Sequence, residues 1–165
     1  MTNCKQIPLP KIENVDIHKL DFFFKLGNHL FETRYSHHAW KSFDLMRDEK
    51  VSPMMKHFPF IEKWIDRCEK HTGFKKIKHC YISVVLPKNQ IPWHVDLQNT
   101  EIFCPAALTS LVTDNSFIEF ENDKQYTYKT GHSYLIKSGV KHRIMNLSDT
   151  NRYTLCVTPK ENPYV

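Results

Sequence analysis

The N-terminal half of the chain carries apolar residues at helical spacing. Between Asp16 and Leu30 apolar side chains recur every three or four positions, and Asp16 has the side chain of an N-cap residue. A second stretch of this kind follows Ser52, with Pro53 in its first turn, and Gly73 stands where a C-terminal cap belongs. The pattern predicts one helix in each stretch. Residues around 35–50 fit neither a helix nor a strand clearly.

After Gly73 the pattern changes from helical to extended. The stretch 77–86 is rich in β-branched and aromatic residues and ends at Pro87, and shorter runs of the same kind follow between turn-like clusters of Gly, Asn, Asp and Ser. Evenly spaced short strands predict an antiparallel sandwich or barrel. We therefore expect one domain over 1–165, with 1–76 as helical support and 77–165 as the β core. The shorter runs are 106–113, 116–120, 125–128, 132–137, 142–147 and 152–158.

Composition fits a packed protein without a membrane span. The chain has 165 residues, of which 41% are hydrophobic and 13% aromatic. No apolar run is long enough to cross a bilayer, the N-terminus has no signal-like apolar segment, and the five cysteines form no CxxC pair. We therefore expect a cytoplasmic protein with no membrane partner. The net charge of +5 is spread along the chain, which makes nucleic acid a disfavoured partner.

Three residues of the β-rich half have the chemistry of a metal site. His94 and Asp96 lie two positions apart in IPWHVD, so on a strand both side chains point to the same face. His142 begins a later predicted strand, 48 positions after His94. Two histidines and one carboxylate form the facial triad of non-haem Fe(II) oxygenases, which leaves adjacent coordination positions open. The sequence therefore predicts that His94, Asp96 and His142 bind one metal ion, Fe(II).

Ten residues after His142 comes Arg152, and Thr154 follows on the same strand face. An arginine presents a planar fork of donors to a carboxylate, and a hydroxyl beside it can donate one more hydrogen bond. A dicarboxylic keto acid could bind the metal at one end and Arg152 with Thr154 at the other. This pair therefore predicts 2-oxoglutarate as cosubstrate, because pyruvate has no second carboxylate.

These motifs lie in segments that resemble the Fe(II)- and 2-oxoglutarate-dependent oxygenases. The segments ISVVLPKNQIPWHVD, YLIKSGVKHRIMNLSD and NRYTLCV are most similar to the aspartyl/asparaginyl β-hydroxylase group, and the resemblance covers Ile82 to Pro159. It implies a double-stranded β-helix of the jelly-roll, cupin-like type, buttressed by the helices. It also implies iron on the triad and the distal carboxylate of 2-oxoglutarate on Arg152.

The resemblance adds one cosubstrate residue and shows one departure. In that group a serine about eleven positions before the first ligand helps to hold the cosubstrate, and Ser83 stands there. Tyr81 shares the strand face of Ser83, so it is expected either to contact the cosubstrate or to pack in the β core. The group also carries an Arg-x-His pair after the HxD segment, and the corresponding stretch here, EIFCPAALTSL, has neither residue.

The expected activity is hydroxylation of an amino-acid side chain, in a peptide or a free amino acid, with 2-oxoglutarate and O2 consumed and succinate and CO2 released. One alternative is the same iron centre acting on a nucleobase or other small molecule. Another is a non-catalytic metal-binding cupin-like module, which has no need of Arg152 and Thr154. Weaker expectations are outer contacts of the metal site from Trp93 and Asn146, a substrate-facing loop over 97–104, and a disfavoured zinc site from Cys68, His71, His79 and Cys80.

Overall fold

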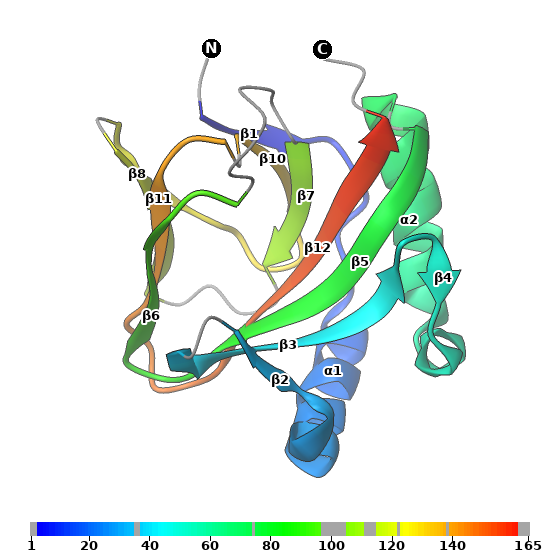
Figure 1. Cartoon of the computed structure of the whole chain (residues 1–165), viewed down its shortest axis with the longest axis horizontal. Helices are drawn as coiled ribbons and strands as arrows, with labels where there is room; N and C mark the ends of the chain where they lie inside the picture. Colours follow the sequence, from blue (N-terminus) through cyan, green and yellow to red (C-terminus); the bar gives the residue numbers. More distant parts are fainter. Residues whose placement is uncertain are drawn as a thin grey trace.

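Two antiparallel β-sheets and two α-helices form the described part of the chain, which comprises residues 3–34, 37–73, 75–96, 105–110, 115–121, 123–137 and 139–161 of a computed structural model (Figure 1). The helical elements are α1 (Asn14–Gly27), η1 (Asn28–Leu30), η2 (Pro53–His57) and α2 (Pro59–Thr72). The strands are β1 (Cys4–Ile7), β2 (Glu32–Arg34), β3 (His37–Arg47), β4 (Lys50–Val51), β5 (Lys75–Val85), β6 (Asn89–His94), β7 (Pro105–Ser110), β8 (Ser116–Phe120), β9 (Gln125–Thr127), β10 (Ser133–Lys137), β11 (His142–Asn146) and β12 (Arg152–Glu161).

The strands form a major and a minor sheet. The major sheet has the order β1-β10-β7-β12-β5-β3-β2, with β4 paired to β3, and the minor sheet has the order β6-β11-β8-β9. Figure 1 shows the minor sheet facing the major sheet, with the long strands β3, β5 and β12 running away from it toward the helices. Two antiparallel sheets that face each other and are built from one chain form a jelly-roll, or double-stranded β-helix, as the resemblance implies.

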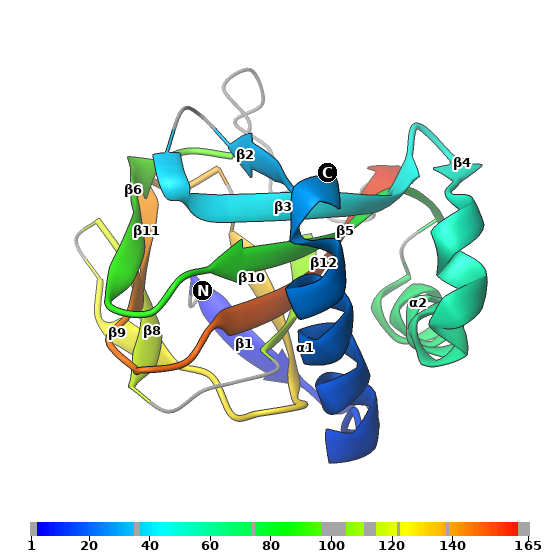
Figure 2. The same ribbon diagram turned by 90° about the horizontal axis from the view of Figure 1, so that it is seen from below.

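Alternation along the strands of the major sheet divides the apolar residues between two cores. On β12, Cys156 belongs to the core between the two sheets, whereas Leu155 and Val157 belong to a second core under the helices. Figure 2 shows α1 lying along the face of the major sheet that carries this second core. The helices therefore cover one face of the major sheet, and the opposite face is free to line a site against the minor sheet.

Helix α1 begins earlier than the sequence predicts. Its N-cap is Glu13, not Asp16, and Asp16 instead pairs with Lys19 at 3.0 Å from the first turn. A carboxylate in the first turn still interacts favourably with the helix dipole. Ile17, Leu20 and Phe24 face the core under the helix, as the apolar spacing predicts. In the described part of the chain no helix is long and apolar enough to cross a membrane.

The second predicted helix is divided in two. Ser52 caps the short helix η2 by accepting a hydrogen bond from the Met54 backbone N–H at 3.2 Å. Phe58 then leaves the helical conformation, because the residue before a proline is disfavoured there, and α2 begins at Pro59. The predicted cap at Gly73 is confirmed, since this glycine has a φ of 72° and its N–H donates to the Glu69 carbonyl.

Residues 1–76, which were expected to form a helical support, are not all helical. This segment also supplies β1 to β4, which join the major sheet, and β5 already begins at Lys75. The ambiguous stretch near 35–50 is largely β3, which pairs with β5. Ser42 is a buried polar residue on the face of β3 that points toward the minor sheet. It interrupts the alternation of apolar and polar residues that predicts a half-buried strand, so the sequence pattern did not identify β3.

Candidate metal and cosubstrate site

The paired ends of two strands in the minor sheet place the three predicted ligands together. His94 is the last residue of β6, His142 is the first residue of β11, and the two are opposite each other in the antiparallel ladder. Asp96 follows two residues after His94, just beyond the end of the strand. Ligand atoms of the three side chains all lie within 4.8 Å of one another. The structure therefore confirms that these three residues meet.

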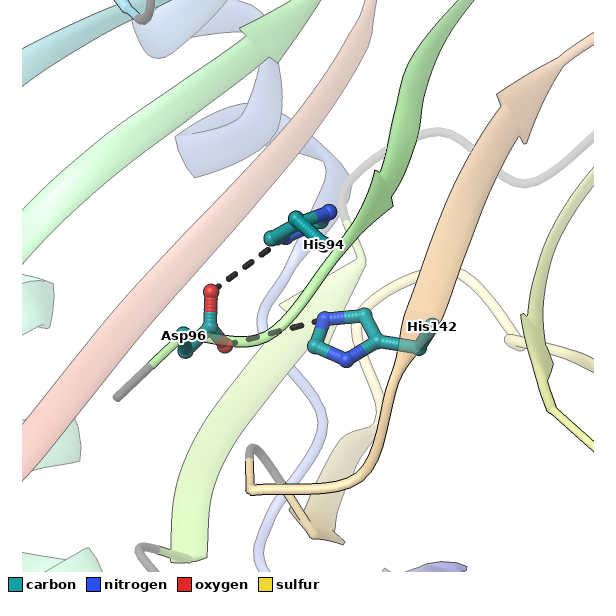
Figure 3. A group of neighbouring side chains, drawn as sticks. All are labelled: His94, Asp96 and His142. Atoms are coloured by element: carbon teal, nitrogen blue, oxygen red, sulfur yellow. Dashed lines mark ion pairs between the residues drawn. The ribbon is translucent and has the colours of Figure 1, made fainter. Parts of the chain in front are cut away.

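The Asp96 carboxylate lies between the two imidazoles (Figure 3). Its Oδ1 is 3.3 Å from His94 Nε2, and its Oδ2 is 3.6 Å from His142 Nε2. Cis ligands in an octahedral site are separated by about 3 Å when metal–ligand bonds are about 2.1 Å. The spacing of these atoms therefore fits one divalent ion held on one face.

Both imidazoles are oriented by backbone carbonyls. Nδ1 of His94 lies 2.7 Å from the Pro92 carbonyl, and Nδ1 of His142 lies 2.8 Å from the Val140 carbonyl. A carbonyl can only accept, so each Nδ1 carries a proton, and each Nε2 faces Asp96 as the nitrogen that can bind a metal once it is unprotonated. Metal-binding histidines are commonly held in this way.

The two histidines differ in burial and therefore in pKa. Burial lowers the pKa of His142, whose side chain is only 1% exposed, and the nearby Asp96 does not restore it. Burial also acts to lower the pKa of His94, but hydrogen bonds to Asp96 and Pro92 outweigh it and leave that pKa raised. Without a metal, a proton is therefore held preferentially by His94.

Arg152, Thr154 and Ser83 line the inner face of the major sheet next to this group. Thr154 on β12 pairs with Ser83 on β5, and Arg152 pairs with Val85. These three of the four predicted cosubstrate residues are buried, and Nη1 of Arg152 donates to Thr154 Oγ1 at 2.6 Å. Tyr81 also lies on β5, opposite Cys156 and four residues from Val85, and it is half-buried.

The buried guanidinium of Arg152 lacks partners for most of its donors. The residue is 0% exposed, and its Nε and Nη2 have no hydrogen-bond partner within the described residues. A buried arginine stays charged, so an unpaired guanidinium is costly to bury. Its plane lies over the Tyr128 ring, with Cζ 5.4 Å from the ring centroid, which leaves the donors at its edge for an anion. The site therefore fits a carboxylate that none of the described residues supplies.

Aromatic residues that the sequence did not single out pack against the site. Trp40 on β3 donates its indole N–H to Ser83 Oγ at 3.0 Å, and its ring lies 5.5 Å from the His94 ring. The Phe120 ring lies 5.6 Å from the His142 ring. Trp40 could have been found only by recognising β3 as a strand. Tyr128 lies just past β9 and has no distinguishing sequence signal.

The weaker expectations have mixed outcomes. Asn146 does not reach the metal group. It is 0% exposed and holds the turn before Arg152, donating to the Val85 and Thr150 carbonyls at 2.9 Å. Cys68 and Cys80 are 0% exposed and belong to the core under the helices. Among the described residues, His94, Asp96 and His142 are the only group placed to hold a metal ion, so the zinc alternative is not supported. The expected substrate-facing loop, 97–104, lies outside the described residues.

Three solved structures of similar shape are oxygenases. An oxidoreductase of the 2OG-Fe(II) oxygenase family from Burkholderia pseudomallei shares 14% identity over 97% of this chain and 85% of its own, with a TM-score of 0.61. A viral collagen prolyl hydroxylase from Paramecium bursaria Chlorella virus-1 shares 10% identity over 95% of each chain, with a TM-score of 0.63. A Trichoplax adhaerens prolyl hydroxylase shares 14% identity over 95% of this chain and 83% of its own, also with a TM-score of 0.63.

Identities this low show a shared fold, and sequence comparison supplies the family. No curated protein sequence matches this chain. The model of the aspartyl/asparaginyl β-hydroxylase family matches residues 18–161, which is most of the sequence and includes the metal group, Ser83 and Arg152. The chain therefore belongs to the aspartyl/asparaginyl β-hydroxylase family, whose members are Fe(II)- and 2-oxoglutarate-dependent hydroxylases.

Proposed function

We propose that this hydroxylase binds Fe(II) through His94, Asp96 and His142 and modifies an amino-acid side chain in a peptide or a free amino acid. The observation that carries the proposal is the buried, incompletely paired guanidinium of Arg152 on the sheet that faces the metal group. A simple metal-binding module has no use for a buried cation there. A dicarboxylic keto acid gives that cation its anion and reaches the metal with its other end.

Each residue of the site has a defined task in this proposal. The carbonyls of Pro92 and Val140 hold a proton on each Nδ1, so each Nε2 is the nitrogen that binds the metal, and Asp96 balances part of the metal's charge. Arg152 grips the distal carboxylate, while Thr154 accepts one arginine N–H and is free to donate its own hydroxyl proton. Trp40 holds Ser83 and packs against His94, so it links the two halves of the site.

When bound, Fe(II) and 2-oxoglutarate would supply the oxidising chemistry. One atom of O2 would enter the substrate C–H bond as a hydroxyl group, and the other would enter succinate as the keto acid loses CO2. The residues bind and orient the reactants and exclude bulk water. His142 and Arg152 are 1% and 0% exposed, so that side of the site is dry, whereas the Asp96 side chain is 32% exposed. Substrate is therefore proposed to approach from the side of Asp96.

A peptide or amino-acid substrate is supported by the structural relatives. The Trichoplax prolyl hydroxylase was solved with a peptide fragment of a hypoxia-inducible factor, and the viral collagen prolyl hydroxylase with 2-oxoglutarate. The family model likewise bears the name of a reaction on aspartyl and asparaginyl side chains. We propose the same substrate class here without assigning the residue that is hydroxylated.

The proposed function is tested by succinate release from 2-oxoglutarate in the presence of Fe(II) and O2. Panels of peptides, free amino acids, oligonucleotides and nucleosides are compared, with His142→Ala as the matched inactive control. We expect peptides or amino acids to stimulate release above the substrate-free rate. Stimulation by oligonucleotides or nucleosides alone would replace the proposed substrate class. Release that is equal in His142→Ala and the unchanged protein would contradict the assigned metal centre.

A further inference from the structure

Three residues form a chain of contacts on the outer face of the minor sheet, behind the metal group. Arg143 Cζ lies 5.0 Å from the centroid of the Trp93 ring, and Nε and Nη2 of Arg143 each lie 2.6 Å from Glu119 Oε2. Trp93 is on β6, Arg143 on β11 and Glu119 on β8. We call these three residues the outer-face brace, because together they connect three neighbouring strands.

The brace lies directly behind the predicted ligands. Trp93 immediately precedes His94, and Arg143 immediately follows His142. Arg143 alternates with His142 on β11 and so points away from the ligands, and Trp93 lies against Arg143 on this outer side of the sheet. Both helices lie on the far side of the major sheet in Figure 1, so they do not cover this outer face of the minor sheet. Trp93 is 40% exposed, and the Arg143 side chain is 31% exposed.

The backbone at this point is held less regularly than elsewhere in the ladder. The pairing of β11 with β6 changes register between His142 and Ile144, which marks a bulge or irregularity beside the ligand. β6 is also the edge strand of the minor sheet and pairs with β11 alone in the described order. His94 and Asp96 therefore depend on the end of an edge strand, whereas His142 lies between two strands.

We propose that Arg143 is a positioning residue that fixes the end of β6 against β11 and so holds His94 and Asp96 opposite His142; this rests on the proposed metal-binding function. The guanidinium stacks on Trp93 through its face and pairs with Glu119 through its edge. It thus links β6 to β8 across β11, where the irregular pairing leaves the backbone less constrained. Arg143 contacts neither the metal ligands nor the cosubstrate residues in the described contacts.

The chain offers a matched control for this role. Lys141 Nζ pairs with Glu121 Oε1 at 2.9 Å, and Lys141 immediately precedes His142. This ion pair joins the same neighbouring segments as the Arg143–Glu119 pair and is also beside a ligand. It has no aromatic partner on β6 among its described contacts, so its loss should leave the end of β6 unchanged.

The test measures Co(II) binding to the metal-free protein by anaerobic calorimetry, together with the visible spectrum of bound Co(II). Arg143→Met keeps the aliphatic stem and removes the guanidinium. We expect it to weaken Co(II) affinity by roughly tenfold, the lower end of the effect of removing a direct partner of a metal ligand, and to alter the Co(II) spectrum. Lys141→Met should change the affinity less than about threefold and leave the spectrum unaltered. Arg143→Lys keeps the charge and loses the stacking, so it should fall between them.

A second measurement separates positioning from stability. The thermal midpoint of each metal-free variant is recorded, and the titrations are made well below it. If Arg143→Met lowers the midpoint but binds Co(II) with unchanged affinity and spectrum, the brace only stabilises the sheet and the proposal is overturned. Equal weakening by Lys141→Met would overturn it as well. Failure of the unchanged protein to bind Co(II) would instead count against the metal site itself, and the two failures are therefore distinguishable.

Trp93→Leu completes the test. Arg143 is proposed to act on β6 through the Trp93 ring. The double variant Arg143→Met/Trp93→Leu should therefore bind Co(II) about as weakly as the weaker-binding of Arg143→Met and Trp93→Leu alone. Additive losses would mean that the two side chains act independently, which the proposal does not allow.

Discussion

Nη1 of Arg152 donates a hydrogen bond to Oγ1 of Thr154 at 2.6 Å, in a part of the sandwich where both residues are almost fully buried. This contact leaves two other nitrogen atoms of the guanidinium without partners among the described residues. The pair therefore has the character of a preformed anion site. It lies on the major sheet, across from the minor sheet that carries the three metal-binding candidates.

Replacing Arg152 with Met should weaken cosubstrate binding without destabilising the protein. Removing a buried charge that no described residue neutralises is often neutral or stabilising, so we expect an unchanged or higher thermal midpoint. Loss of charge-assisted hydrogen bonds worth about 1.5–3 kcal/mol should weaken 2-oxoglutarate binding by roughly tenfold to more than a hundredfold. Titration calorimetry with Mn(II) and 2-oxoglutarate measures the loss of cosubstrate affinity, and a thermal melt measures the midpoint. The affinity for Co(II) or Mn(II) should stay unchanged. A joint loss of metal and cosubstrate affinity would contradict the assignment of Arg152.

The contact between Trp40 and Ser83 predicts a non-additive effect on stability. Ser83→Ala leaves the buried indole N–H without its acceptor, which should cost about 1–3 kcal/mol of unfolding free energy. Trp40→Phe removes the donor and keeps a ring beside His94. Adding Ser83→Ala to Trp40→Phe should therefore cost much less than Ser83→Ala alone. Urea denaturation of the four proteins measures this, and additive free energies would show that the hydrogen bond contributes nothing.

Asn146 should be important for stability although it does not reach the metal group. Its amide donates to three carbonyls, those of Val85, Leu86 and Thr150, and its oxygen accepts from Ser148. Asn146→Asp replaces the donor with a buried oxygen, so we expect a loss of about 3 kcal/mol or more. For a chain of this size that lowers the thermal midpoint by roughly 6–12 °C. Asn151→Asp, five residues along, is a control at a less buried amide, and an equal loss there would contradict this account.

Metal affinity should fall as the pH is lowered, with about one proton released for each ion bound. The pKa of His94 is raised above the ordinary histidine value of 6.5, and that of His142 is lowered below it. Between these two pKa values the metal must displace the proton of His94, whereas His142 is already neutral. Calorimetry in buffers of different ionisation enthalpy counts the protons. Release of two protons throughout this interval would show that the two histidines are not differentiated as the structure implies.

Much of the β core follows from local pattern in the sequence. The runs 116–120 and 142–147 coincide with β8 and β11 to within a residue, because each alternates buried and half-buried side chains. The HxD segment and Arg152 were recognisable because metal and carboxylate chemistry restrict the residue types that can serve. Their convergence depends on pairing between distant strands, and the structure confirms it for His94 and His142.

Other features could not be read from the sequence because long-range contacts decide them. β1 is a four-residue strand whose partner, β10, lies more than a hundred positions away. β3 has an inner face with Ser42 on it, since that face lines the site rather than an apolar core. Tyr128 follows a short strand and becomes important only because the fold places its ring under Arg152.

The central claim is that one metal ion on His94, Asp96 and His142 and one 2-oxoglutarate on Arg152 occupy the same site. Anaerobic addition of Fe(II) and 2-oxoglutarate to the metal-free protein, followed by visible absorption, tests this directly. We predict a weak charge-transfer band that requires both components, is absent in His94→Ala and His142→Ala, and needs a much higher 2-oxoglutarate concentration in Arg152→Met. An unchanged protein that shows no such band at saturating Fe(II) and 2-oxoglutarate, or a band that survives in both histidine variants, would contradict the account.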